Sequence, residues 1–176
     1  MASDCLKTPL RNNSCDHAIS IAVIHHLSTL DRRKAAIREI VRILNTGGKA
    51  LIYVWAMEQK VNNEQSKYIS TKRNEELSVN LTENTEEKEE KTIDYHVNRT
   101  EFMQQDLFVP FSKKPQNVKK SQQSSEIMNK METYYRFYHL FLKGELEQLC
   151  VEACSNVEIV DSYYDDGNWC VILRKL

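Results

Sequence analysis

Two apolar runs of strand length, separated by a helical repeat, restrict what this chain can fold into more than any other feature. The first run covers residues 16–24 and the second covers 49–56, where β-branched and aromatic residues are common. Between them, apolar residues recur at helical spacing over 35–44, after Ser28 or Thr29 as a candidate N-cap. A strand, a helix and a second strand form a right-handed βαβ unit with parallel strands. The sequence therefore predicts an α/β fold.

Glycines mark two turns in this pattern. The predicted helix ends at 45–48, Asn-Thr-Gly-Gly, where a glycine can take the left-handed conformation of a C-cap. Near the carboxyl terminus, residues 157–164 alternate as a strand and 169–173 form a second apolar run. Asp-Gly at 166–167 lies between them, which is the signal of a tight hairpin turn. We therefore expect a carboxy-terminal β-hairpin.

Composition divides the chain into three segments. Residues 1–59 and 132–176 carry the apolar patterns of a folded core, including a helical face at 143–150. Residues 60–131 are mostly polar, with many Glu, Lys and Asn. Such a segment buries too little apolar surface to offset the entropy of ordering it, so it predicts a largely disordered insertion. An aromatic island near 95–111 is expected to dock on the folded part.

Charge and cysteine content exclude several classes of protein. The formal net charge of −1 gives no overall attraction for nucleic acid, so an RNA contact requires a local basic patch. No apolar run reaches the roughly 18 residues of a membrane span, and the start lacks a signal-peptide pattern. The five cysteines favour a reduced intracellular compartment and core positions. Cys150 and Cys154 lack a second Cys/His pair, so we predict no metal site.

The order of these elements resembles the later half of class I S-adenosylmethionine (SAM)-dependent methyltransferases. The match runs over 16–55 as strand, His-His, helix, Gly-Gly, strand. In that superfamily the sheet order is 3-2-1-4-5-7-6 with an antiparallel seventh strand. The resemblance therefore implies a partial Rossmann-like sheet in the order 4-5-7-6, with the hairpin formed by the last two strands of the chain.

Four separate blocks resemble one family more closely, the methyltransferases that esterify 5-carboxymethyluridine at the tRNA wobble position. They are Ser20–His26 (SIAVIHH), Ala50–Gln59 (ALIYVWAMEQ), Arg136–Phe141 (RFYHLF) and Ser162–Val171 (SYYDDGNWCV). The island stretches 96–100 and 105–110 resemble the branch whose animal members carry this methyltransferase at the end of an AlkB-type protein.

The resemblance implies a function, a cofactor and partners. The implied function is SAM-dependent esterification of the wobble uridine, with tRNA as substrate and a small zinc-binding activator subunit as a partner, in the cytoplasm and/or nucleus. In the family, a glycine-rich loop and an acidic residue precede the stretch that matches Asp4, and this sequence contains neither. We therefore expect an amino-terminally truncated form, and whether it is an enzyme stays open. The alternatives are an inactive interaction or tRNA-contacting module, and a methyltransferase of small molecules.

The cofactor residues implied by the resemblance come from two places. Asp4 and Cys5 belong to an Asp-Cys-Leu stretch that in relatives lies beside the adenine. Ala22, His25 and His26 stand at the end of the first predicted strand, where ligands bind in open α/β sheets. The alternative for the histidine pair is ordinary polar capping of the strand.

The candidate substrate residues are Trp55, Arg136, Tyr138 and His139. Trp55 ends the second predicted strand, and an aromatic face there suits an unstacked base, although a core position is the alternative. Arg136, Tyr138 and His139 form an aromatic-basic cluster for a carboxylate or RNA phosphates, or else an amphipathic approach to the next helix. We assign no catalytic residue, because a carboxylate needs only alignment with the methyl donor.

Overall fold

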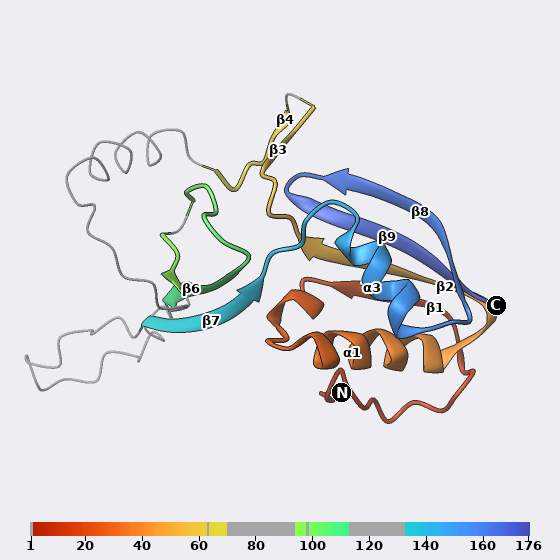
Figure 1. Cartoon of the computed structure of the whole chain (residues 1–176). Helices are drawn as coiled ribbons and strands as arrows, with labels where there is room; N and C mark the ends of the chain where they lie inside the picture. Colours follow the sequence, from red (N-terminus) through yellow and green to blue (C-terminus); the bar gives the residue numbers. More distant parts are fainter. Residues whose placement is uncertain (1, 63, 70–93, 98, 113–132) are drawn as a thin grey trace, which may run out of the picture.

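The computed structural model describes residues 2–62, 64–69, 94–97, 99–112 and 133–176 (Figure 1). Its elements in chain order are β1 (Cys15–Ile21), the 3-10 helix η1 (Ile24–His26), α1 (Leu30–Ile43), β2 (Leu44–Trp55), β3 (Lys60–Val61), β4 (Glu64–Gln65), β5 (Asp94–Tyr95), β6 (Asp106–Ser112), β7 (Thr133–His139), α3 (Glu145–Ala153), β8 (Val157–Asp165) and β9 (Asn168–Lys175).

The larger sheet has the order β1-β2-β9-β8. β1 and β2 run parallel and are joined by α1, with Ile19 opposite Leu51. β9 is antiparallel to both β2 and β8, and it places Ile172 opposite Leu51. This arrangement confirms the predicted βαβ unit and the 4-5-7-6 order of a partial class I methyltransferase sheet.

Helix α1 begins as predicted and ends differently. Thr29 is its N-cap, and the Thr29 hydroxyl accepts a hydrogen bond from the backbone N–H of Arg32 at 3.3 Å. The predicted glycine C-cap is wrong, because the helix ends at Ile43 and passes through an extended Leu44 directly into β2. The second glycine has another role: a Cβ on Gly48 would lie 2.9 Å from the carbonyl oxygen of Asp16. Gly48 thus allows the two strands to approach each other.

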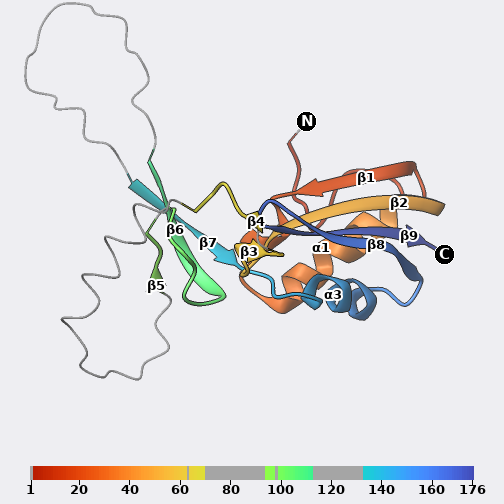
Figure 2. The same ribbon diagram turned by 90° about the horizontal axis from the view of Figure 1, so that it is seen from above.

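The main core lies between this sheet and the two helices. α1 and α3 pack side by side on one face of the sheet (Figure 2). The largest fully buried side chains of this core are Ile24, Ile37, Leu44, Ile52, Val54, Phe141, Leu146, Val171 and Leu173. The predicted face of α3, formed by Leu146, Leu149 and Cys150, is buried here. On the opposite face of β1, Ile19 and Ile21 are exposed.

A second sheet, β5-β6-β7, has its own small core. β6 and β7 pair antiparallel, and β5 joins β6 in parallel. Phe102, Leu107, Val109, Tyr138 and Leu140 are buried there. Main-chain hydrogen bonds join this sheet to the first one, because Phe141 N–H donates to the Trp55 carbonyl and Met57 N–H donates to the Phe141 carbonyl, both at 2.9 Å. The aromatic island therefore extends the fold at the end of β2.

Much of the predicted insertion, at 70–93 and 113–132, lies outside the described residues, so its predicted disorder stays a prediction. The described part at 60–69 contains the β3–β4 hairpin. Just after this hairpin, the Lys67 N–H donates to Asp166 Oδ1 at 2.8 Å. All five cysteines are free thiols. None of the described helices is long and apolar enough to cross a membrane.

The turn between β8 and β9 confirms the predicted hairpin. Its two central residues, Asp166 and Gly167, have φ values of 42° and 85°. Two positive φ values in a two-residue loop are typical of a type I′ turn, which fits the twist of the flanking strands. A Cβ on Gly167 would also lie 2.6 Å from the Ser66 hydroxyl and 2.8 Å from Gln59 Oε1. Gly167 is thus required both by its conformation and by close packing.

Substituting Gly167 with alanine is expected to destabilise the protein more than the same change at Gly47. Both glycines have positive φ, which costs an L-residue about 1–2 kcal/mol. Of the two, only Gly167 also has neighbouring atoms that would clash with an added Cβ, since nothing lies within 4 Å of a Cβ on Gly47. Urea denaturation should therefore give Gly167→Ala a free energy of unfolding at least about 1 kcal/mol lower than Gly47→Ala. Equal losses would show that the contact with Ser66 is unimportant.

Candidate functional site

The carboxyl ends of β1 and β2 lie next to each other because the two strands are parallel. β1 ends at Ile21, and Ala22 then adopts a left-handed backbone with φ of 57°, while its N–H still donates to the Tyr53 carbonyl at 3.3 Å. This conformation is costly for a residue with a Cβ, and such residues gather at ligand sites. It turns the chain into η1, which carries His25 and His26.

His25 is fully buried and neutral. Its Nδ1 accepts a hydrogen bond from the backbone N–H of Trp55 at 3.0 Å. Burial, together with the nearby His26 and Arg136, lowers the pKa of His25 to about 3. Since Nδ1 accepts, the proton of the neutral ring lies on Nε2. That atom is buried and has no hydrogen-bond partner within the described part of the chain.

Aromatic rings from three elements surround His25. The Tyr138 ring, from β7, stacks on His25 with centroids 4.9 Å apart and an interplanar angle of 24°. Tyr138 also lies 4.6 Å from the Trp55 ring and 4.2 Å from the His26 ring. His26 is half-buried, and its Nδ1 lies 3.0 Å from the Phe137 carbonyl, to which it donates. We call His25, His26, Trp55 and Tyr138 the aromatic site.

Arg136 brings a positive charge to this site. Its guanidinium lies 5.6 Å from the centroid of Tyr138 and 4.8 Å from that of Phe111. Arg136 and Tyr138 are two residues apart on β7 and therefore share one face of the strand. Among the residues that the structure describes, Arg136 makes no ion pair. An exposed cation beside stacked rings suits a planar anionic ligand.

His139 lies elsewhere, although the sequence grouped it with Arg136 and Tyr138. Successive residues of a strand point to opposite faces, so His139 turns away from the aromatic site. Its Nδ1 and Nε2 lie 2.6 Å from carboxylate oxygens of Asp106 and Glu145 respectively. Burial raises the pKa of Glu145, but its bonds with His139 and the Leu142 N–H outweigh this, and the pKa is lowered. The structure thus places His139 in a hydrogen-bonded cluster with Asp106 and Glu145 that joins β6, β7 and α3.

The first predicted cofactor residues lie beside β1, on the helix side of the sheet. Asp4 is exposed, and its Oδ1 accepts from the Leu6 N–H at 2.9 Å. Cys5 is half-buried, and burial followed by the Asp4 charge raises the pKa of its thiol. Cys5 lines a cavity of about 190 Å³ together with Ala18, Ser20, Val23, Ile24, Ala36, Glu39 and others. Cys5 therefore lines the same cavity as Ser20 and Val23, which lie on either side of Ala22 in the sequence. The structure places Trp55 and Tyr138 in a separate cluster.

Three residues at the site were not identified from the sequence. The Tyr68 ring lies 5.1 Å from Trp55, and Phe102 lies 6.0 Å from Trp55. His96 hydrogen-bonds through Nε2 to the Tyr68 hydroxyl at 2.9 Å, and burial lowers the pKa of His96 to about 4. For His96 and Phe102 the signal in the sequence was the aromatic content of the island, which indicated docking but no partner. Tyr68 lies outside the island.

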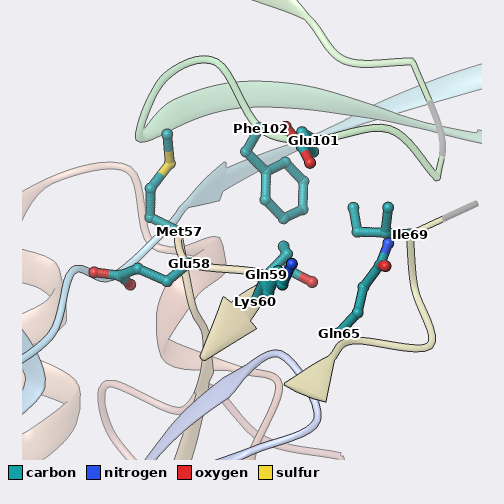
Figure 3. A pocket seen from close by; sticks show the side chains of 8 residues that line it. All are labelled: Met57, Glu58, Gln59, Lys60, Gln65, Ile69, Glu101 and Phe102. Atoms are coloured by element: carbon teal, nitrogen blue, oxygen red, sulfur yellow. The ribbon is translucent and has the colours of Figure 1, made fainter. Parts of the chain in front are cut away.

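A more polar pocket of about 380 Å³ lies beside this cluster (Figure 3). It is lined by Met57, Glu58, Gln59, Lys60, Gln65, Ile69, Glu101 and Phe102. Glu58 extends away from the pocket, and its two carboxylate oxygens accept from Trp169 Nε1 at 2.9 Å and from Lys143 N–H at 3.1 Å. The Gln59 amide donates to the carbonyls of Ala56 and Gly167. These side chains therefore hold the end of β2 against the β8–β9 hairpin.

Comparison with known proteins assigns the fold to a class. A family described as a methyltransferase domain matches residues 1–52. A SAM-dependent methyltransferase from Clostridium acetobutylicum superposes with a TM-score of 0.55 at 9% identity, covering 99% of this chain and 63% of that chain. One from Methanosarcina mazei gives a TM-score of 0.52 at 12% identity, covering 99% and 65%. The chain has the fold of a class I SAM-dependent methyltransferase.

Sequence relatives narrow this class to one family. The chain is 44% identical to the tRNA (carboxymethyluridine(34)-5-O)-methyltransferase of Xenopus tropicalis, over 98% of this chain and 28% of the relative. It is 35% identical to the enzyme of that name from Schizosaccharomyces pombe, over 98% of this chain and 62% of the relative. Along nearly its whole length, the chain is thus similar to tRNA (carboxymethyluridine(34)-5-O)-methyltransferases. It spans less than two thirds of the length of these relatives.

The neutral His25 makes stability depend on pH. Its folded-state pKa of about 3 lies below the ordinary value of 6.5, so below pH 6.5 the unfolded chain takes up a proton that the folded chain refuses. Stability is therefore lost as pH falls from about 6.5 toward 3. Urea denaturation should show that His25→Gln reduces this slope by up to about 1.4 kcal/mol per pH unit. His17→Gln, at an exposed position on β1, is the matched control, and identical slopes in both variants would contradict a neutral His25.

Proposed function

We propose that this chain forms the substrate side of a SAM-dependent methyltransferase that esterifies 5-carboxymethyluridine at the tRNA wobble position. The observation that carries the proposal is the aromatic site at the adjoining ends of β1 and β2. It offers the half-buried ring of Trp55 for a nucleobase, with the buried Tyr138 ring packed behind it, and the cation of Arg136 for a carboxylate. Both relatives described above are named for that reaction.

The residues near β1 fit part of the cofactor. The cavity beside Cys5 is largely apolar, with Ala18, Val23, Ile24 and Ala36 in its wall, which suits a flat adenine. We propose that Asp4, Cys5, Ala22 and His26 contact SAM, with the exposed left-handed Ala22 leaving the strand end open to it. The prediction that His25 also contacts SAM is corrected by its full burial, and His25 instead holds the end of β2 through the Trp55 N–H. When bound, SAM supplies an electrophilic methyl group on a positively charged sulfur.

The proposed reaction requires alignment of the carboxylate with the methyl donor more than it requires proton transfer. A carboxylate is already ionised at neutral pH, so no residue needs to remove a proton from it. Trp55 holds the base, the buried Tyr138 fixes the Trp55 ring, and Arg136 orients the carboxylate through charge-assisted hydrogen bonds. His25 stays neutral, so the positive charge beside the carboxylate comes from Arg136. Fixing two reactants in this way can lower the barrier by several kcal/mol, up to about 7–11.

The partners follow from the family. We propose tRNA as the macromolecular substrate and a small zinc-binding activator subunit as a protein partner, with a cytoplasmic or nuclear location. Co-purification of the full chain from cells, followed by zinc analysis of the bound fraction, tests the second partner.

An anticodon-type hairpin with 5-carboxymethyluridine at the wobble position should bind the full chain about tenfold more tightly than one with uridine. The difference is the charge-assisted contact between Arg136 and the carboxylate. Fluorescence anisotropy measures both affinities. Arg136→Gln should remove the preference, whereas Arg174→Gln, an exposed arginine on β9, should keep it.

Methyl transfer is measured in the same samples by adding SAM and analysing nucleoside digests by mass spectrometry. Formation of the methyl ester on the carboxymethylated hairpin alone supports the proposed reaction. Preference without ester formation would favour the interaction module over an enzyme. Equal affinity for both hairpins would show that the aromatic site does not recognise the carboxymethyl group.

A further inference from the structure

The amino-terminal segment, residues 4–14, precedes β1 and lies along α1 (Figure 1). It begins with a turn in which the Lys7 N–H donates to the Asp4 carbonyl at 3.2 Å and the Leu6 N–H donates to Asp4 Oδ1 at 2.9 Å. Cys5 in this turn and Thr8 just after it line the cavity of about 190 Å³, together with residues of α1 and β1. The segment therefore forms one wall of the cavity that we assign to the adenine of the cofactor.

Glu39 on α1 holds this wall at Thr8. Its Oε1 accepts from the Thr8 N–H at 2.6 Å and from the Thr8 hydroxyl at 2.7 Å. Glu39 is only 7% exposed, and it lines the same cavity. A buried carboxylate is costly unless hydrogen bonds and an opposite charge compensate it. The position of Thr8 is therefore tied to the charge of Glu39.

Arg42, one turn further along α1, supplies the compensating charge. Its Nε and Nη2 donate to the two carboxylate oxygens of Glu39, both at 2.7 Å. The same guanidinium donates to the Leu10 carbonyl at 2.9 Å and to Asn12 Oδ1. The bonds from Arg42, with those from Thr8, lower the pKa of Glu39 to about 2 in spite of burial, so its carboxylate stays ionised at neutral pH. One acid–base pair thus holds the segment at three residues.

The carboxylate of Glu39 is fully used by these contacts. It accepts four hydrogen bonds, two from Thr8 and two from Arg42, which matches the roughly four lone-pair sites of a carboxylate. Glu39 therefore affects a ligand in the cavity through the residues that it holds, and not by direct contact.

We propose that Glu39 and Arg42 are positioning residues for the cofactor. They hold Cys5 and Thr8 against the cavity, and in this way they set its affinity for the adenosine part of SAM. The inference rests on the proposed function, because it takes this cavity as the cofactor site. It adds two residues of α1 that touch no reacting atom to those on which binding of the cofactor depends.

The thiol of Cys5 reports on the position of the segment. Cys5 is half-buried, and burial raises the pKa of its thiol, so release of the segment exposes the thiol and favours its reactive thiolate form. Cys150 and Cys170 are fully buried in the main core, so their reaction reports unfolding of the core. Alkylation of the full chain with iodoacetamide, followed by mass spectrometry of peptides, measures all three rates in one sample.

Thr8→Val and Glu39→Gln should each make alkylation of Cys5 about tenfold faster, because each variant breaks a hydrogen bond to a charged group. Thr8→Ser keeps the hydroxyl and should react as the unchanged chain does. Lys34→Gln is the matched control, since it removes an ion pair between α1 and α3 at 2.8 Å, and it should change the rate at Cys5 by less than about twofold. Equal increases at Cys5 and at the two core cysteines would overturn the proposal, because they would show only a general loss of stability.

The link to the cofactor is measured by adding S-adenosylhomocysteine, which contains the same adenosine group. It should slow alkylation of Cys5 in the unchanged chain, and Thr8→Val and Glu39→Gln should need about ten times more of it for the same protection. Thr8→Ser should need the unchanged amount. Equal protection of all variants would overturn the proposed effect on affinity. Absence of protection in the unchanged chain would overturn the assignment of the cavity, and the rates without ligand distinguish that failure from a failure of the positioning itself.

Discussion

Hydrogen bonds at the end of β2 hold together all the parts on which the site depends. The Trp55 N–H donates to His25 Nδ1, and the Trp55 carbonyl accepts from Phe141 N–H. The Ala56 N–H donates to the Gly167 carbonyl in the β8–β9 turn at 2.9 Å. One short stretch of backbone thus joins the end of β1, the second sheet and the carboxy-terminal hairpin. Because buried N–H and C=O groups are costly when unpaired, this arrangement fixes the relative positions of the rings around it.

The consequence for chemistry is a site that is apolar, aromatic and uncharged at its centre, with its cation at the rim. Burial keeps His25 neutral, and Tyr138 covers one face of its ring. Such an environment excludes water at the centre of the site, whereas Arg136 at the rim stays exposed to solvent. The geometry suits alignment of a preformed carboxylate, which is the demand that the proposed methyl esterification makes.

Strand alternation on β7 divides neighbouring residues between two tasks. Arg136 and Tyr138 face the aromatic site, whereas His139 joins Asp106 and Glu145 in the hydrogen-bonded cluster that connects the second sheet to α3. The sequence showed these residues as one aromatic-basic cluster, because the same letters are compatible with a strand or with an amphipathic approach to a helix. Without the strand and its partner β6, the face to which each side chain belongs was undetermined.

The sequence by itself determined the βαβ unit, a helix N-cap at Ser28 or Thr29, the apolar face of α3 and the hairpin at Gly167, because each rests on local periodicity or on turn chemistry. Short blocks near 20–26, 50–59, 136–141 and 162–171 also led to the tRNA (carboxymethyluridine(34)-5-O)-methyltransferases, to which the chain is similar. Only the tertiary structure decided that Gly48 serves close packing against Asp16 and that Tyr68, His96 and Phe102 join the site. Those contacts link residues distant in the chain, and their energy depends on which side chains the folded backbone brings together. Local sequence carries no record of that choice.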